Sequence, residues 1–88
     1  MALYPDTIQD VRESCERYRR KEIGEEQLQE RLWEAVQIIV AVDEKDLRDY
    51  LRWAEGQLEL LRFTIDQERL YENALALVAQ IEERAKEY

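Results

Sequence analysis

Hydrophobic residues recur along the chain at spacings of three and four, which is the period of an amphipathic α-helix. Breaks in this period divide the pattern into four segments, so the sequence predicts helices over residues of about 5–21, 25–41, 44–64 and 67–86. Their connections are short, and short connections favour antiparallel neighbours. We therefore expect an all-α fold, a small antiparallel four-helix bundle, built as one domain over residues 1–88.

Candidate capping residues support these boundaries. Gly24 is expected to end the first helix in the left-handed conformation that a C-cap favours. Asp43, with Asp46 three residues later, is typical of a capped start for the third helix, and Asp66 is expected to cap the fourth. The alternative is that the third and fourth helices form one kinked helix from Asp43 to Glu87.

Each predicted helix has one hydrophobic stripe for a common core. In the second helix Trp33, Ile38 and Val40 widen the stripe, so this helix is expected to lie deepest. The predicted core stripes are Ile8, Val11, Cys15 and Tyr18; Leu28, Leu32, Ala35, Val36 and Ile39; Leu47, Leu51, Ala54, Leu58, Leu61 and Ile65; and Leu70, Ala74, Leu77, Ile81 and Tyr88.

The third helix carries a second set of apolar residues. At 100° per residue, Trp53, Gly56, Leu60 and Phe63 fall almost opposite its core stripe. Large aromatic residues concentrate binding energy at protein interfaces. Glycine inside a helix is unfavourable by roughly 1 kcal/mol, which suggests that another backbone approaches Gly56 closely. Either another helix of the bundle covers this side, or a partner protein does.

Acidic residues surround this second side, and Tyr50 stands among them. Aromatic residues ringed by carboxylates are typical of a docking surface for a basic protein, because the acids steer encounter. A salt-bridged, solvated helix face is the competing interpretation. The predicted protein-binding residues are Glu30, Glu34, Asp46, Asp49, Tyr50, Trp53, Gly56, Leu60 and Phe63.

The net charge is −8, and its distribution is uneven. The acids and bases of residues 1–24 cancel, so residues 25–88 carry the whole excess. Such a surface repels phosphate backbones and anionic lipid, which argues against nucleic-acid and membrane binding and favours a basic protein partner. The single cysteine, Cys15, excludes an intramolecular disulfide, and the N-terminus has no signal-peptide pattern, so we expect a cytoplasmic protein.

Catalytic chemistry has little support in the residue types. Histidine is absent, which removes the commonest general base and the usual zinc ligands. The only serine, Ser14, lies in no nucleophile motif, and no glycine-rich phosphate loop occurs. We expect no enzyme activity, cofactor or metal; a magnesium-dependent all-α nucleotide pyrophosphatase, which would use paired acids on two helices, is a remote alternative.

In its small size, its acidity and its aromatic residues set among carboxylates, the chain resembles the small immunity proteins that neutralise bacterial nuclease toxins. The segment 46–53 (DLRDYLRW) carries this resemblance, although the paired-tyrosine motif of the colicin DNase group is missing. The resemblance implies an antitoxin-type inhibitor that occludes a basic partner. The alternative is a homodimeric structural or adaptor bundle that is closed through the same helix face.

Overall fold

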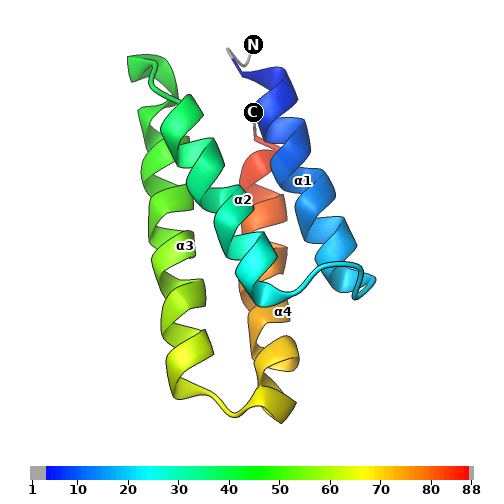
Figure 1. Ribbon diagram of the computed structural model, residues 1–88. Coiled ribbons are helices and arrows are strands. Elements are labelled where there is room, and N and C mark those ends of the chain that lie inside the picture. The colour runs from blue at the N-terminus through cyan, green and yellow to red at the C-terminus, as the bar shows by residue number, and fades with distance from the viewer. Residues whose placement is uncertain (1–3, 88) are drawn as a thin grey trace.

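The computed structural model describes residues 4–87, apart from the side chain of Asp43. Four α-helices follow one another, with a short 3₁₀ helix, η1 (Val42–Glu44), before the third: α1 (Pro5–Arg19), α2 (Glu25–Ile38), α3 (Lys45–Thr64) and α4 (Gln67–Ala85). Consecutive helices run in opposite directions, so both ends of the chain lie at the same end of the molecule (Figure 1). The predicted all-α antiparallel bundle is confirmed.

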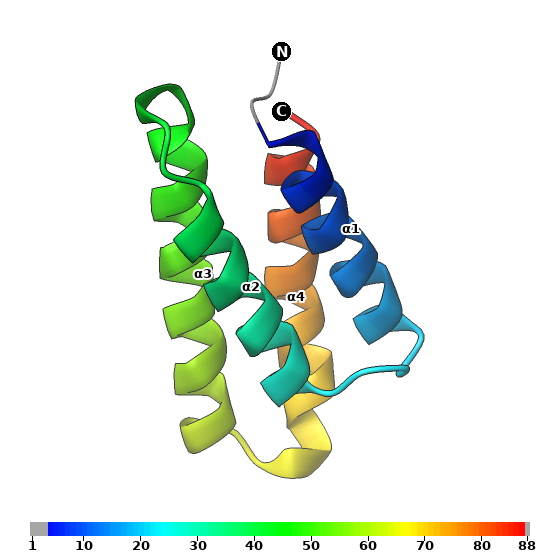
Figure 2. The ribbon, with the colours of Figure 1, turned by 45° about the horizontal axis from the view of Figure 1, so that its top comes forward.

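Each helix packs against two neighbours, in the cyclic order α1, α2, α3, α4. Figures 1 and 2 show α2 and α4 on opposite sides of the bundle, with α1 and α3 between them. The four hydrophobic stripes meet along the axis and form one core. Most of the predicted core residues are buried; Leu61 and Ile65 are only partly buried, and Tyr88 lies outside the described residues.

The end of α1 differs from the prediction, because Gly24 is not its C-cap. Lys21 adopts the left-handed conformation instead, with φ of 62°. The Lys21 and Glu22 amides donate to the carbonyl oxygens of Tyr18 and Arg17 at 3.0 and 2.9 Å, which is the pattern of a Schellman motif. Gly24 is extended and forms the N-cap of α2, where its N–H donates to Gln27 Oε1 at 2.9 Å.

Helix α2 ends at Ile38, three residues before the predicted boundary. The β-branched run that follows has low helix propensity, and residues 39 and 41 are extended. The Tyr4 hydroxyl accepts hydrogen bonds from the amides of Val40 and Ala41 at 3.3 and 3.1 Å, which replaces the lost helical bonds. Trp33, Ile38 and Val40 are exposed, so the prediction that they widen the core stripe is wrong.

Helices α3 and α4 are separate, so the single kinked helix is wrong. Ile65 and Asp66 have ψ near 140°, which reverses the chain between the two helices. Asp66 occupies the predicted N-cap position of α4, but its side chain forms no capping hydrogen bond. The N-cap of α3 is Glu44, because Asp43 falls inside η1; the Asp43 side chain is outside the described residues.

Candidate functional site

The bundle leaves the second apolar side of α3 uncovered. Trp53 is 49% exposed, Leu60 54% and Phe63 77%, and Gly56 is also exposed. We call these four residues the outer strip. Leu47, Leu51, Ala54 and Leu58, on the opposite side of the same helix, are buried. Helix α3 therefore presents one apolar side to the core and a second one to solvent.

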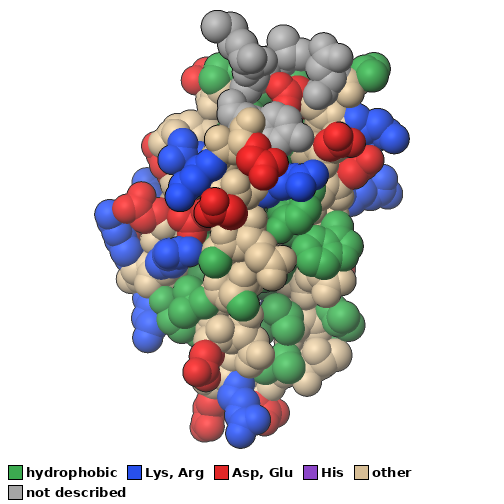
Figure 3. Space-filling model, turned by 180° about the vertical axis from the view of Figure 1, so that it is seen from behind, with side chains coloured by type: hydrophobic (Ala, Val, Ile, Leu, Met, Phe, Trp, Pro, Cys, Tyr) green, Lys and Arg blue, Asp and Glu red, His purple; other side chains and the backbone are tan. Residues whose placement is uncertain are grey.

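Trp53 lies on the part of the outer strip that faces α4. Its ring packs against Tyr50, with 5.6 Å between the centroids, and the Tyr50 ring lies 5.3 Å from the Arg84 guanidinium of α4. Tyr50 is partly buried, and this burial raises the pKa of its phenol. Hydrophobic side chains gather over the middle and lower parts of the face that α3 and α4 form (Figure 3).

Gly56 and Phe63 complete the outer strip in different surroundings. A Cβ atom at Gly56 would have no neighbour within 4 Å, so nothing in the bundle requires glycine there. Phe63 lies near the α3–α4 connection, where it lines a hollow with Gln67 and the first turn of α2. The predicted close approach of another backbone at Gly56 does not come from this chain.

The acidic residues predicted on α3 are balanced by bases. Asp49 lies 3.8 Å from Lys45 and 3.9 Å from Arg48, and Asp46 is exposed in the first turn. The helix has four acids and four bases, so its net charge is zero. Residues 25–44 contain six acids and one base, so this segment carries five of the eight excess negative charges, whereas α3 carries none.

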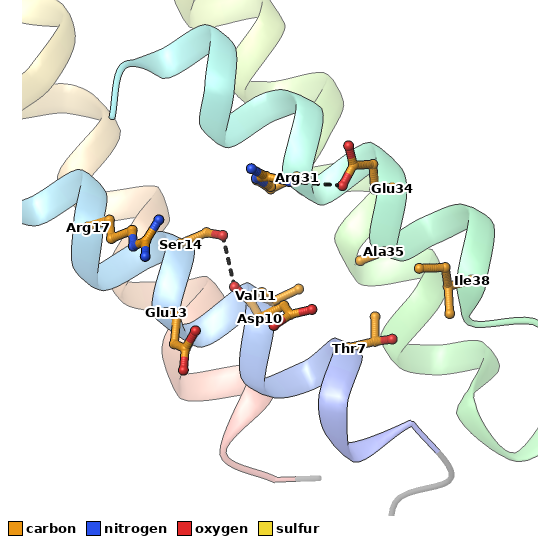
Figure 4. Close-up of a pocket in the computed structure, with 10 residues that line it drawn as sticks. All are labelled: Thr7, Asp10, Val11, Glu13, Ser14, Arg17, Arg31, Glu34, Ala35 and Ile38. Atoms are coloured by element: carbon orange, nitrogen blue, oxygen red, sulfur yellow. Dashed lines mark hydrogen bonds and ion pairs between the residues drawn. The ribbon is translucent and has the colours of Figure 1, made fainter. Parts of the chain in front are cut away.

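Glu34 is the predicted site residue that lies away from α3. It lines a groove between α1 and α2, where its carboxylate pairs with Arg31 at 3.3 Å (Figure 4). Arg17, Asp10 and Glu13 line the same groove, so acids and bases are mixed there. The structure does not bring Glu34 together with the other predicted residues.

Glu30 lines an open cleft of roughly 540 Å³ between α2 and α3, and it also lines a hollow with Arg17 and Arg31 on the α1 side. The aromatic residue of this cleft is Trp33, which is 48% exposed although it is expected to widen the core stripe of the second helix. A signal for it was present, because at 100° per residue Trp33 stands roughly 115° from the centre of the α2 core stripe. The α2–α3 cleft is lined by Glu26, Gln29, Glu30, Trp33, Glu55, Glu59 and Arg62.

Chemical groups for catalysis are sparse in the described part of the chain. Cys15 is fully buried, and this burial, reinforced by the charge of Glu82, raises the pKa of its thiol to about 12. The thiol is thus protonated at neutral pH and a poor nucleophile. Among residues 4–87 no group of three or more potential metal-ligating side chains is found, and no helix there is long and apolar enough to cross a membrane.

Sequence and structure comparisons supply no relative from which a role could be transferred. Models of protein families, curated proteins and solved structures were all searched, and none matches this chain. The function must therefore be argued from the outer strip, the α2–α3 cleft and the charge distribution.

Proposed function

We propose that this protein is a non-enzymatic binding module that docks the outer strip of α3 onto a basic partner protein. The observation that carries the proposal is the exposure of Trp53, Leu60 and Phe63 on one helix side. Exposed apolar groups gathered on one surface mark interaction sites in soluble proteins, whereas single ones need no explanation. Tryptophan is also among the residues that contribute most to interface affinity.

The charge distribution supports a basic partner. Helix α3 is neutral, so the outer strip can be desolvated without burying an excess of one charge. Glu25 and Glu26 of α2 line the hollow beside Phe63, and Glu30 lies in the cleft beside α3. These acids would remain at the rim of such an interface, where charges accelerate encounter with a cationic surface. Apolar contact would then provide most of the affinity, and the acidic rim would increase the association rate.

The finer proposal is an immunity or antitoxin type of inhibitor. A nuclease needs a cationic surface to bind the phosphate backbone of its substrate. An acidic bundle docked on that surface would block the substrate by occlusion and would need no catalytic residue of its own. The small size and the net charge of −8 suit this role.

The test starts with the partner in the producing cells. A photo-reactive phenylalanine analogue at Phe63 is expected to cross-link one basic protein, while the same analogue at Val42, exposed but away from the outer strip, should not. With the purified pair, we expect association to slow as salt rises, because screening weakens steering. Binding that leaves the partner fully active would contradict the inhibitor role, and a salt-independent association rate would contradict electrostatic docking.

A symmetric homodimer is the second candidate, and Gly56 favours it. Another helix can approach the backbone closely at Gly56, because a Cβ placed there would have nothing within 4 Å beyond the adjacent backbone of its own helix. Arg52 and Glu59 stand on either side of Gly56 in the sequence. If two copies of α3 crossed antiparallel at Gly56, each Arg52 would approach the Glu59 of the other copy. Analytical ultracentrifugation at micromolar to millimolar concentration decides, since a monomer throughout that range excludes the homodimer.

A further inference from the structure

The α2–α3 cleft has a composition that the outer strip lacks. Four glutamates and Arg62 give its lining a net charge of −3, although α3 as a whole is neutral. Trp33 contributes a half-exposed aromatic ring to the same cleft. Glu59 belongs to the cleft and lies three residues from Gly56, so a partner on the outer strip would also reach the cleft.

One end of the cleft already holds a guanidinium group of this chain. Arg62 donates from Nη1 to Gln29 Oε1 at 2.6 Å, and its Nη2 lies 3.9 Å from Glu26. Gln29 in turn donates to Glu55 Oε1 at 2.8 Å, which ties α2 to α3 across the cleft floor. Gln29 and Glu26 thus already hold one guanidinium at this end of the cleft.

The remaining carboxylates of the cleft are paired with no cation among the residues that the structure describes. Within the described residues, Glu30, Glu55 and Glu59 form no ion pair. A second cation would therefore find three acids and the Trp33 ring in one cleft. Arginine suits this combination better than lysine, because its planar group stacks on aromatic rings and pairs with carboxylates through two hydrogen bonds.

We propose that the α2–α3 cleft receives an arginine side chain of the partner, held against Trp33 by Glu30, Glu55 and Glu59. This inference rests on the proposed docking function and names the group that the partner must present. The outer strip would supply the apolar contact, and the cleft would select a partner with an arginine next to its apolar surface. Tryptophan is the aromatic residue that attracts cations most strongly.

The cleft can be tested with a short peptide of alternating glycine and arginine as the probe. The Trp53→Phe variant leaves Trp33 as the only tryptophan, so its fluorescence reports on the cleft alone. We expect a saturable change in Trp33 emission. The affinity obtained from it should be about tenfold weaker in a Glu30→Gln/Glu59→Gln double variant, because two nearby charges are removed. The matching peptide of glycine and lysine is expected to bind more weakly.

The matched control is a Glu13→Gln/Glu68→Gln double variant, which has the same net charge but changes exposed acids of α1 and α4. An equal loss of peptide affinity in both double variants would overturn the proposed arginine site, because it would reveal a general attraction of the peptide to an acidic protein. Equal affinity for the two peptides would overturn the choice of arginine. An unchanged Trp33 spectrum at saturating peptide would also overturn the proposal.

The same variants separate this inference from the docking function. With the purified partner, Trp53→Ala tests the outer strip, and Trp33→Ala tests the cleft. Loss of affinity in Trp53→Ala alone would overturn the cleft and leave docking intact. Full affinity in both variants would overturn both. Far-ultraviolet circular dichroism of each variant shows that it remains folded.

Discussion

The two sides of α3 carry similar hydrophobic residues but have different surroundings. The inner side, with Leu51, Ala54 and Leu58, is buried against α2 and α4. The outer strip, with Trp53, Leu60 and Phe63, has no such cover. Bundle stability explains the inner side, because burial of apolar area is the main stabilising term in folding. It does not explain the outer strip, whose apolar residues the bundle leaves in contact with water.

Helix α3 thus contributes to the core on one side and exposes an apolar strip on the other. The inner side forms a continuous seam of small and medium aliphatic residues. The outer strip instead combines two aromatic residues, one leucine and a glycine that nothing in the bundle contacts. That composition is typical of interfaces, where aromatic residues are enriched, rather than of a second core.

The largest expected effect comes from truncating one leucine on each side of α3. Leu58→Ala should lower the free energy of unfolding by about 3 kcal/mol, because it leaves a cavity in the core. Leu60→Ala should change it by less than about 0.5 kcal/mol, as expected for a surface position. Urea unfolding followed by circular dichroism measures both. Similar losses in the two variants would show that the outer strip is covered in solution.

Trp53→Ala should weaken binding to the partner by about 2 kcal/mol, or roughly thirtyfold, since buried tryptophans dominate interface energies. Its own stability should change much less, because the side chain is half exposed. Isothermal titration calorimetry with the purified partner measures the affinity. Val42→Ala is the control, as it shortens another exposed hydrophobic residue; an equal loss there would argue against a localised surface.

The backbone conformation favours glycine at position 21, which is a lysine, whereas the bundle does not require the glycine at position 56. Lys21 holds a positive φ, which is unfavourable by roughly 1–2 kcal/mol for a residue with a Cβ. Its ammonium lies 4.8 Å from the Tyr71 ring, an exposed contact worth about 0.5 kcal/mol. Lys21→Gly should therefore stabilise the protein by about 1 kcal/mol. A lower thermal midpoint in this variant would contradict the left-handed conformation at the end of α1.

Gly56→Ala gives the smallest expected effect and the sharpest division between fold and surface. Alanine has open space at this position and a higher helix propensity, so the free energy of unfolding should rise by about 0.5–1 kcal/mol. If another backbone approaches Gly56 in a complex, the same change should weaken association. Higher stability with unchanged association would show that Gly56 serves neither the bundle nor the interface.

The sequence by itself determined the four helices, most of their buried residues and the charge distribution. Helical periodicity is a local property, and it places Leu47, Leu51, Ala54 and Leu58 on one side of a helix whatever surrounds that helix. The opposite position of Trp53 and Phe63 follows from the same period. The helix termini are predicted less accurately. The left-handed conformation expected at Gly24 is adopted by Lys21.

Only the tertiary structure decided which sides are covered. Cover depends on helices that are distant in the sequence, so periodicity cannot show that α1 and α4 leave the outer strip free. For the same reason, periodicity does not show that Glu30 lines both the α2–α3 cleft and a hollow against α1, whereas Glu34 lines the groove between α1 and α2. Trp33, expected to widen the core stripe, lies in the α2–α3 cleft instead. A cleft is lined by residues of two helices, so the pattern of one helix cannot predict it.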